Sequence, residues 1–270
     1  MSGTLRSGSD AENLQWQYER LRDAGRGYDA IGQDYTAARR TDPTWEVRLW
    51  SKLDEAGWVL NVGAGAGSYE SHHPRLVAVE PSGTMRRQRP SWAAPCVNAR
   101  AEDLPFDDKS FDVAMAILTI HHWSDLERGI EELKRVAHRY LVLTYDMAVQ
   151  RNFWLTANYI PEIADAEEQR VPSIAAVRDL FGSSCMEPML VPAQCTDGFA
   201  TAYWRRPWLL LKPTVRQSCS ALALTDSEAV DRGLRELERD LADGSWYEKH
   251  AELLSLEAWD AGFRLITGPA

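Results

Sequence analysis

The sequence lacks several features that would place it in common classes of protein. No apolar run approaches the roughly 20 residues that a membrane span needs, and the polar residues 1–10 do not form a signal peptide. The four cysteines are scattered with no C-x-x-C pair, which disfavours structural zinc and a disulfide framework. We therefore expect no bound metal, no membrane partner and a reducing, cytoplasmic location.

Basic residues are also scarce relative to acidic ones. The chain has 30 Lys and Arg against 40 Asp and Glu, a formal net charge of −10. Basic pairs occur at Arg86-Arg87 and Arg205-Arg206, but no basic stripe does. Because a nucleic acid would bind against the overall field of the protein, the charge predicts that nucleic acid is not its partner. The phosphate-binding pattern G-x-x-x-x-G-K-[ST] is absent, which excludes a P-loop.

The length of 270 residues suits one large α/β domain, and it leaves a monomer and a homodimer equally open. We interpret residues 1–12 as a flexible tail. Residues 13–270 are expected to form a single domain, in which 13–43 and about 147–260 contribute cap and substrate-pocket elements. With 11 tryptophans, the chain also has the aromatic side chains that favour pockets for flat or cationic ligands.

Apolar runs alternate with helical or loop segments through the first half of the chain, which predicts a doubly wound, mostly parallel sheet. A ligand would then lie at the carboxyl ends of the strands, near the point where strand order reverses. The clearest crossover helix is 126–137, and further helices are expected over 44–56 and over 225–243 with Thr225 as N-cap. The expected strands are 58–62, 76–80, 95–98, 111–117, 140–145, 187–192 and 263–267.

Three alternating glycines, Gly63, Gly65 and Gly67, follow the first apolar run, and Glu80 ends the next one. Glycine lets the backbone approach a ligand closely, and a carboxylate at a strand tip can accept both hydroxyl protons of a ribose. A dinucleotide fingerprint would need its third glycine at Ser68 and a full helix after it, and residues 69–74 are too short for that helix. A nucleoside without phosphates, such as S-adenosylmethionine (SAM), fits better.

Four segments in the right order carry a resemblance to a known family. Residues 61–67 resemble the first motif of class I SAM-dependent methyltransferases of the type 11 small-molecule family, with Asn61 where an acid is usual. Residues 79–82 resemble the second motif, 100–106 the adenine-edge loop, and 107–114 the approach to the fourth strand. The resemblance covers about residues 56–146. It implies a Rossmann-like, seven-stranded sheet, with helical caps formed by the N-terminal segment and by an insertion after the fifth strand.

The resemblance also implies a set of cofactor-binding residues. The glycines would approach the methionine part and the ribose, with Glu80 as ribose ligand, while Ala101 and Glu102 would contact adenine. In the N-terminal segment, Tyr35 would cover the cofactor and Arg39 would clamp its carboxylate, although a surface helix with an exposed arginine explains the same pattern. The full set is Tyr35, Arg39, Asn61, Gly63, Gly65, Gly67, Glu80, Ala101 and Glu102.

Candidate catalytic residues follow the fourth and fifth strands. His121 and His122 could supply a general base near neutral pH. Because neighbouring strand residues point to opposite sides, at most one is expected to face the acceptor. Tyr145 and Asp146 are further candidates, Asp146 as a residue that orients a histidine or binds substrate. For each of the four, a purely structural role is the alternative.

The acceptor pocket is predicted after residue 146, where the aromatic side chains Tyr145, Trp154, Tyr159, Tyr203 and Trp204 occur. Arg205 and Arg206 could contact an acidic group there. We expect methyl transfer to a small organic acceptor, aromatic or heteroaromatic, in specialised metabolism, and the sequence leaves O-, N- and C-methylation open. Two alternatives stay open: a SAM-binding protein that does not methylate, such as a cyclase or binding module, and an RNA or protein methyltransferase.

Overall fold

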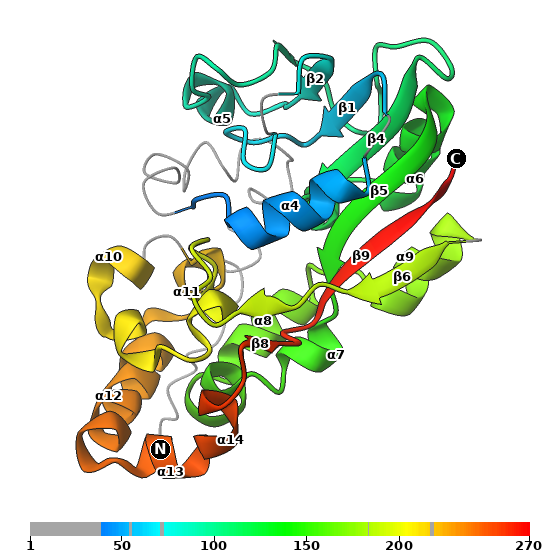
Figure 1. Ribbon diagram of the computed structural model, residues 1–270. Helices are drawn as coiled ribbons and strands as arrows, with labels where there is room; N and C mark the ends of the chain where they lie inside the picture. The colour runs from blue at the N-terminus through cyan, green and yellow to red at the C-terminus, as the bar shows by residue number, and fades with distance from the viewer. Residues whose placement is uncertain (1–38, 54–55, 71–72, 183, 217–218) are drawn as a thin grey trace, which may run out of the picture.

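The computed structural model describes residues 39–53, 56–70, 73–182, 184–216 and 219–270. The tail expected at 1–12 and the proposed cofactor cover Tyr35 lie outside the described residues. The described chain forms one seven-stranded sheet with helices on both faces (Figure 1). Its strands are β1 Val59–Val62, β2 Leu76–Val79, β3 Cys96–Val97, β4 Phe111–Ile117, β5 Ala137–Tyr145, β6 Cys185–Pro188 and β9 Phe263–Pro269.

The strand order β3-β2-β1-β4-β5-β9-β6 confirms the predicted doubly wound sheet. Strands β1 to β5 pair in parallel, whereas β9 runs antiparallel to both of its neighbours. The order reverses between β1 and β4, so the crevice at the topological switch point opens at the carboxyl ends of these two strands. The glycine loop begins at that crevice, directly after β1.

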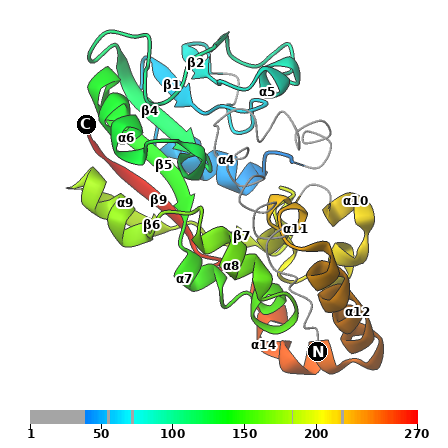
Figure 2. The same cartoon turned by 180° about the vertical axis from the view of Figure 1, so that it is seen from behind.

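Two layers of helix bury the sheet. Helix α4, Pro43–Ser51, lies on one face, while α6, Leu126–Val136, and α9, Ile174–Phe181, lie on the other, as Figures 1 and 2 show from opposite sides. Every residue of β1 is buried, which explains why its run is apolar without alternation. On α6, Ile130, Leu133 and Val136 face the sheet at the expected helical spacing.

The segment between β5 and β9 folds into short helices that gather at one end of the sheet (Figure 1). Its core is continuous with that of the sheet, because Trp154 and Trp204 belong to the same cluster as Val113 and Leu143. The elements are α7 Met147–Gln150, the π-helical turn η3 Leu155–Tyr159, α8 Glu162–Glu168, η4 Ala200–Tyr203, η5 Pro207–Leu211, α10 Pro213–Arg216, α11 Ser220–Ala223, α12 Ser227–Asp243, α13 Ser245–Lys249 and α14 Ala251–Leu254, with a ribbon of β7 Val191–Pro192 and β8 Ala258–Trp259.

Several predicted boundaries were wrong for local reasons. Helix α12 is capped by Asp226, whose side chain accepts the N–H of Ala229, while the Thr225 hydroxyl donates to the carbonyl of Ala221 instead. The helix expected over 44–56 ends at Ser51. The strand expected over 187–192 is divided between β6 and β7, which belong to different sheets. No helix occurs among the described residues between β1 and β2, as the proline-bounded sequence predicted.

Candidate functional site

A pocket opens at the switch point, and we call it the glycine-loop pocket. Gly63 and Gly65 line it with positive φ angles of 70° and 54°, a backbone conformation that L side chains rarely adopt. Gly67 also has a positive φ but does not line the pocket. The full lining is Arg39, Asn61, Gly63, Ala64, Gly65, Ala66, Ser68, Tyr69, Glu80, Pro81, Met85, Arg100, Ala101, Glu102, Ile117, Leu118, Thr119, His122 and Trp123.

Glu80 ties the loop to the end of β2. One carboxylate oxygen accepts the N–H of Gly65 and the other accepts the N–H of Ser82, both at 2.8 Å. Burial raises the pKa of the Glu80 carboxyl above its usual range, and the two backbone N–H groups oppose that rise. A buried carboxylate held in this way keeps further lone pairs for two neighbouring hydroxyl groups, as a ribose would present.

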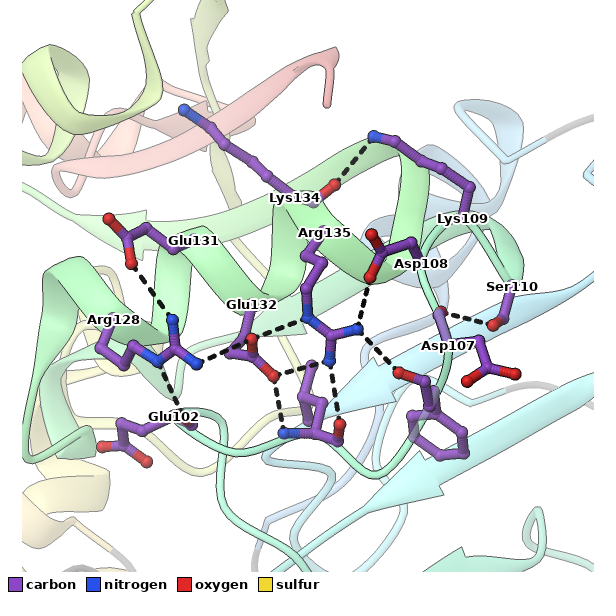
Figure 3. A network of polar contacts seen from close by, with 12 residues as sticks. Glu102, Asp107, Asp108, Lys109, Ser110, Arg128, Glu131, Glu132, Lys134 and Arg135 are labelled. Atoms are coloured by element: carbon purple, nitrogen blue, oxygen red, sulfur yellow. Dashed lines mark hydrogen bonds and ion pairs between the residues drawn. The ribbon is translucent and has the colours of Figure 1, made fainter.

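The loop over residues 100–106 forms another wall of the pocket and is held in place by α6 (Figure 3). Glu132 on that helix accepts the N–H of Leu104 at 2.9 Å, and Arg135 donates to the carbonyls of Leu104 and Phe106. Arg135 also lowers the pKa of the Glu132 carboxyl, so this carboxylate stays ionised. The crossover helix therefore sets where the edge of a bound ring would lie.

Ala101 and Glu102 both line the pocket, but the Glu102 carboxylate is engaged elsewhere. One of its oxygens accepts the N–H groups of Ser124 and Asp125 and the Ser124 hydroxyl, at 2.6 to 3.2 Å. The carbonyl of Glu102 accepts from Arg128 (Figure 3). Glu102 thus links the loop to the start of α6, and its polar contact to adenine stays a prediction.

Arg39 lies at the edge of the glycine-loop pocket, in a buried polar cluster. Its guanidinium pairs with Asp197 at 2.6 Å, and the Tyr69 hydroxyl donates to the same carboxylate at 2.9 Å. The N–H of Gly198 also reaches Asp197, at 2.7 Å. This pairing joins the glycine loop to the segment before η4. The carboxylate partner of Arg39 in the structure is therefore Asp197, and a clamp on the cofactor stays a prediction.

The histidines are not on a strand, so the reason we gave for their orientation was wrong. Strand β4 ends at Ile117, Leu118 has a φ of 52°, and the 3₁₀ turn η2, Ile120–His122, carries both rings. Their surroundings nevertheless differ in part, because His122 lines the glycine-loop pocket and His121 lines a second pocket, while both also border a third hollow beside Trp123 and Arg170.

Burial makes both imidazoles poor bases. It lowers the pKa of His122 to about 3, with Arg170 and Arg39 adding to the effect. The pKa of His121 lies well below its usual value because of burial and the neighbouring His122. Both rings are neutral at neutral pH and can accept a hydrogen bond, but their weak basicity disfavours full proton removal from an alcohol or phenol.

The second pocket lies under the short helices, and we call it the cap pocket. Its apolar wall includes Phe153, Phe199 and Phe263, and its polar side includes Tyr145, which donates to Glu167 at 2.9 Å. Arg39 and Leu118 line both pockets, so the two adjoin. The full lining is Arg39, Leu118, His121, Tyr145, Gln150, Phe153, Leu155, Thr156, Ile163, Glu167, Phe199, Ala200, Thr201, Ser220, Ala221 and Phe263.

Of the five aromatic residues proposed for the acceptor pocket, Tyr145 lines the cap pocket and the other four do not. Trp154 and Trp204 are buried in the core, and the Trp154 indole N–H donates to the carbonyl of Trp204. The Tyr159 hydroxyl donates to Asp240, and Tyr203 packs against that core. The phenylalanines that do line the pocket come from three separate segments, and local sequence carries no sign that they meet.

Three polar predictions take structural roles. Asp146 caps α7 by accepting the N–H of Ala148, and it lines neither pocket. Arg205 donates to the carbonyl of Leu256, and Arg206 donates to those of Cys195 and Ala202. Within the described ranges no cluster of three or more His, Cys, Asp or Glu could hold a metal ion. None of the helices in those ranges is long and apolar enough to cross a membrane.

Comparisons with known proteins agree with this geometry. A family model described as a methyltransferase domain matches residues 60–140. A solved structure from Anabaena variabilis, a candidate methyltransferase from an antibiotic biosynthesis pathway, is 31% identical with a TM-score of 0.78, covering 85% of this chain and 98% of that one. The uncharacterized methyltransferase YcgJ of Bacillus subtilis is 26% identical over 140 residues, which are 47% of this chain and about half (55%) of that relative. The [4+2]-cyclase SpnF shares the fold, at 15% identity and a TM-score of 0.52 over 92% of this chain and 95% of that one.

Proposed function

Because the chain belongs to the class I SAM-dependent methyltransferases, we propose that it methylates a small aromatic or heteroaromatic molecule bound in the cap pocket. SAM, the cofactor of this family, supplies an electrophilic methyl group on a sulfonium. The transfer breaks the sulfur–methyl bond and forms a bond from the acceptor nucleophile to the methyl carbon. The products are S-adenosylhomocysteine (SAH) and the methylated acceptor, and the proton of an O–H or N–H nucleophile passes to water or to a base.

The observation that carries this proposal is the contact between the two pockets. Since Arg39 and Leu118 line both of them, a molecule in the cap pocket would meet the cofactor along a shared edge. Alignment of this kind supplies much of the rate in a displacement that needs reacting atoms about 3–3.5 Å apart.

The lining of the cap pocket supports the class of acceptor. Three phenylalanine rings with Leu118 and Ile163 favour an apolar or aromatic body. His121 and the Tyr145–Glu167 pair provide a few polar groups that could orient it. The similarity to the antibiotic-pathway protein of Anabaena variabilis supports an acceptor from specialised metabolism. The weak basicity of the histidines favours nucleophiles that are reactive without a strong base, such as an electron-rich carbon or an already ionised phenol.

The test is SAH formation with a panel of phenols, aromatic amines and heteroaromatic compounds, with product mass as a second readout. The pocket-filling variant Ala200→Phe should raise the KM for the acceptor about tenfold or abolish turnover, with an unchanged Kd for SAH, because Ala200 lines the cap pocket alone. Ala242→Phe, on the exposed face of α12, is the matched control. Tight SAH binding without methylation of any acceptor would contradict the proposal and favour a non-methylating role, such as cyclisation.

A further inference from the structure

Asn61 stands at the end of β1 and is held by a buried acidic side chain that the sequence analysis did not single out. Its Nδ2 donates to the Oε1 of Glu70 at 3.1 Å. Asn61 is only 2% exposed, yet it lines the glycine-loop pocket. The carboxamide therefore lies between Glu70 on one side and the expected cofactor on the other.

Glu70 is fully buried and forms an ion pair with Arg89. The Nη2 of Arg89 lies 2.6 and 2.9 Å from its two oxygens, and the N–H of Ala94 adds a third donor at 3.0 Å. Arg89, itself 6% exposed, also donates to the carbonyls of Gly65 and Ala94. An ionised carboxylate only accepts hydrogen bonds, so the Asn61 atom that faces it must be the amide nitrogen.

This constraint fixes which end of the Asn61 amide faces the pocket. With Nδ2 committed to Glu70, Oδ1 is the end left for a ligand, since the hydrogen bond that Asn61 makes with the side chains of the described residues uses Nδ2. Ribose hydroxyls are expected at Glu80 and adenine at residues 100–102, so the remaining donor of SAM is its α-ammonium. We propose that Glu70 and Arg89 are positioning residues, which orient Asn61 so that its Oδ1 accepts a hydrogen bond from the ammonium of SAM.

The same arrangement explains why an amide replaces the usual acid at residue 61. An aspartate there would place a second carboxylate about where Nδ2 now lies, 3.1 Å from Glu70. Two carboxylates at that distance cannot both ionise without a large cost. The negative charge at this place in the structure lies on Glu70, behind Asn61 as seen from the pocket, where Arg89 compensates it. The amide is then the group that can contact both the carboxylate and an ammonium.

Binding measurements test this proposal, which rests on SAM as the cofactor and not on the identity of the acceptor. The measured quantity is the preference for SAH, defined as the Kd of the SAH analogue whose amino group is replaced by hydrogen divided by the Kd of SAH. A hydrogen bond to a charged group predicts that the wild type prefers SAH by about tenfold or more. Asn61→Ala and the double variant Glu70→Met/Arg89→Met should each reduce that preference at least about threefold.

The ratio separates positioning from general support of the loop. If Glu70 and Arg89 only hold the loop in shape, the double variant weakens both ligands equally and the ratio stays within about twofold of wild type, which would overturn the proposal. Replacing both partners avoids an uncompensated buried charge. The matched control is Glu162→Met/Arg232→Met, an ion pair that does not line the glycine-loop pocket and should leave the ratio unchanged.

If the double variant does not fold, the wild type decides the matter by neutron diffraction of its SAH complex. The proposal requires the amide deuterons of Asn61 to point at Glu70 and Oδ1 to face the ammonium. The reverse orientation, or an ammonium bound only to other groups, would refute it. Neither result depends on turnover, so failure here is distinguishable from failure to find an acceptor.

Discussion

The imidazole rings of His121 and His122 lie with their centroids 3.9 Å apart on the single turn η2, and each lines a pocket that the other does not. His122 borders the glycine-loop pocket, whereas His121 borders the cap pocket and lies 5.1 Å from the ring of Tyr145. Besides the hollow that both residues border, the two are thus divided between the glycine-loop pocket and the cap pocket. Substitution of His122 should therefore affect the binding of SAH, and substitution of His121 the binding of the acceptor.

Substituting the two histidines singly should produce different kinetic defects. We expect His122→Ala to raise the Kd for SAH about tenfold with little change in the acceptor KM. We expect His121→Ala to raise the acceptor KM by a similar factor and to leave SAH binding unchanged. Calorimetric titration and steady-state kinetics measure the two quantities. Equal, small losses in both variants would remove both residues from the site.

Stability should fall in acid because desolvation keeps the two half-buried histidines neutral in the folded protein. The unfolded chain takes up a proton near pH 6.5, whereas folded His122 does so only near pH 3, so stability is fully present above pH 6.5 and is lost between these values. The slope is up to about 1.4 kcal/mol per pH unit for each such histidine. Urea unfolding across that range should show a shallower slope for His122→Asn and an unchanged one for the exposed His138→Asn.

Glu80 should make cofactor binding depend on both its charge and pH. Replacement by Gln sets an amide N–H₂ against the N–H of Gly65 or of Ser82, so we expect SAH binding to weaken about tenfold or more. Because burial raises the pKa of this carboxyl, wild-type affinity should fall as pH is lowered through that raised pKa. Titration calorimetry from neutral to acidic pH should show this fall in wild type and not in Glu80→Gln. A parallel fall in both proteins would assign it to another group.

Adding a side chain at Gly63 should lower the free energy of unfolding more than adding one at Gly65. A Cβ on Gly63 would collide with Thr119, so Gly63→Ala should destabilise the fold by about 3 kcal/mol. At Gly65 the nearest atom is the mobile Met85 Cε at 3.3 Å, so Gly65→Ala should cost only about 1–2 kcal/mol for its positive φ. Gly65→Leu would extend into the pocket and should abolish SAH binding while the protein stays folded. Retained binding would mean that the loop does not hold the cofactor.

The Arg39–Asp197 pair should matter far more for stability than an ion pair of similar geometry whose carboxylate is exposed. Asp197 is 2% exposed and holds both Arg39 and Tyr69, so Asp197→Ala removes a buried carboxylate that two side chains contact and should cost about 3–5 kcal/mol. Asp260, 41% exposed and paired with Arg264 at 2.8 Å, is the control, and its replacement by Ala should cost about 1 kcal/mol or less. Similar losses by chemical denaturation would show that burial does not set the cost.

Contiguous patterns predicted the fold well. The five apolar runs before residue 146, the glycine spacing and the amphipathic helix 126–137 each lie within about a dozen residues, and each formed the expected strand, loop or helix. The predicted ends of elements were wrong where another local contact was made instead, as at the start of α12, which Asp226 caps in place of Thr225. The reason given for the opposite orientation of His121 and His122 was wrong, because β4 ends before them and Leu118 has a left-handed φ that strand periodicity does not anticipate.

The sequence by itself determined the parallel sheet, the glycine loop and the place of Glu80 at the end of β2, because these depend on residue types at short spacing. Only the tertiary structure decided which side chains complete the site. Arg39 meets Asp197 across 158 positions, and the phenylalanines of the cap pocket come from residues 153, 199 and 263. Asn61 meets Glu70 through a bend that no local pattern encodes. Such contacts depend on how separate elements pack, and packing is a property of the whole chain.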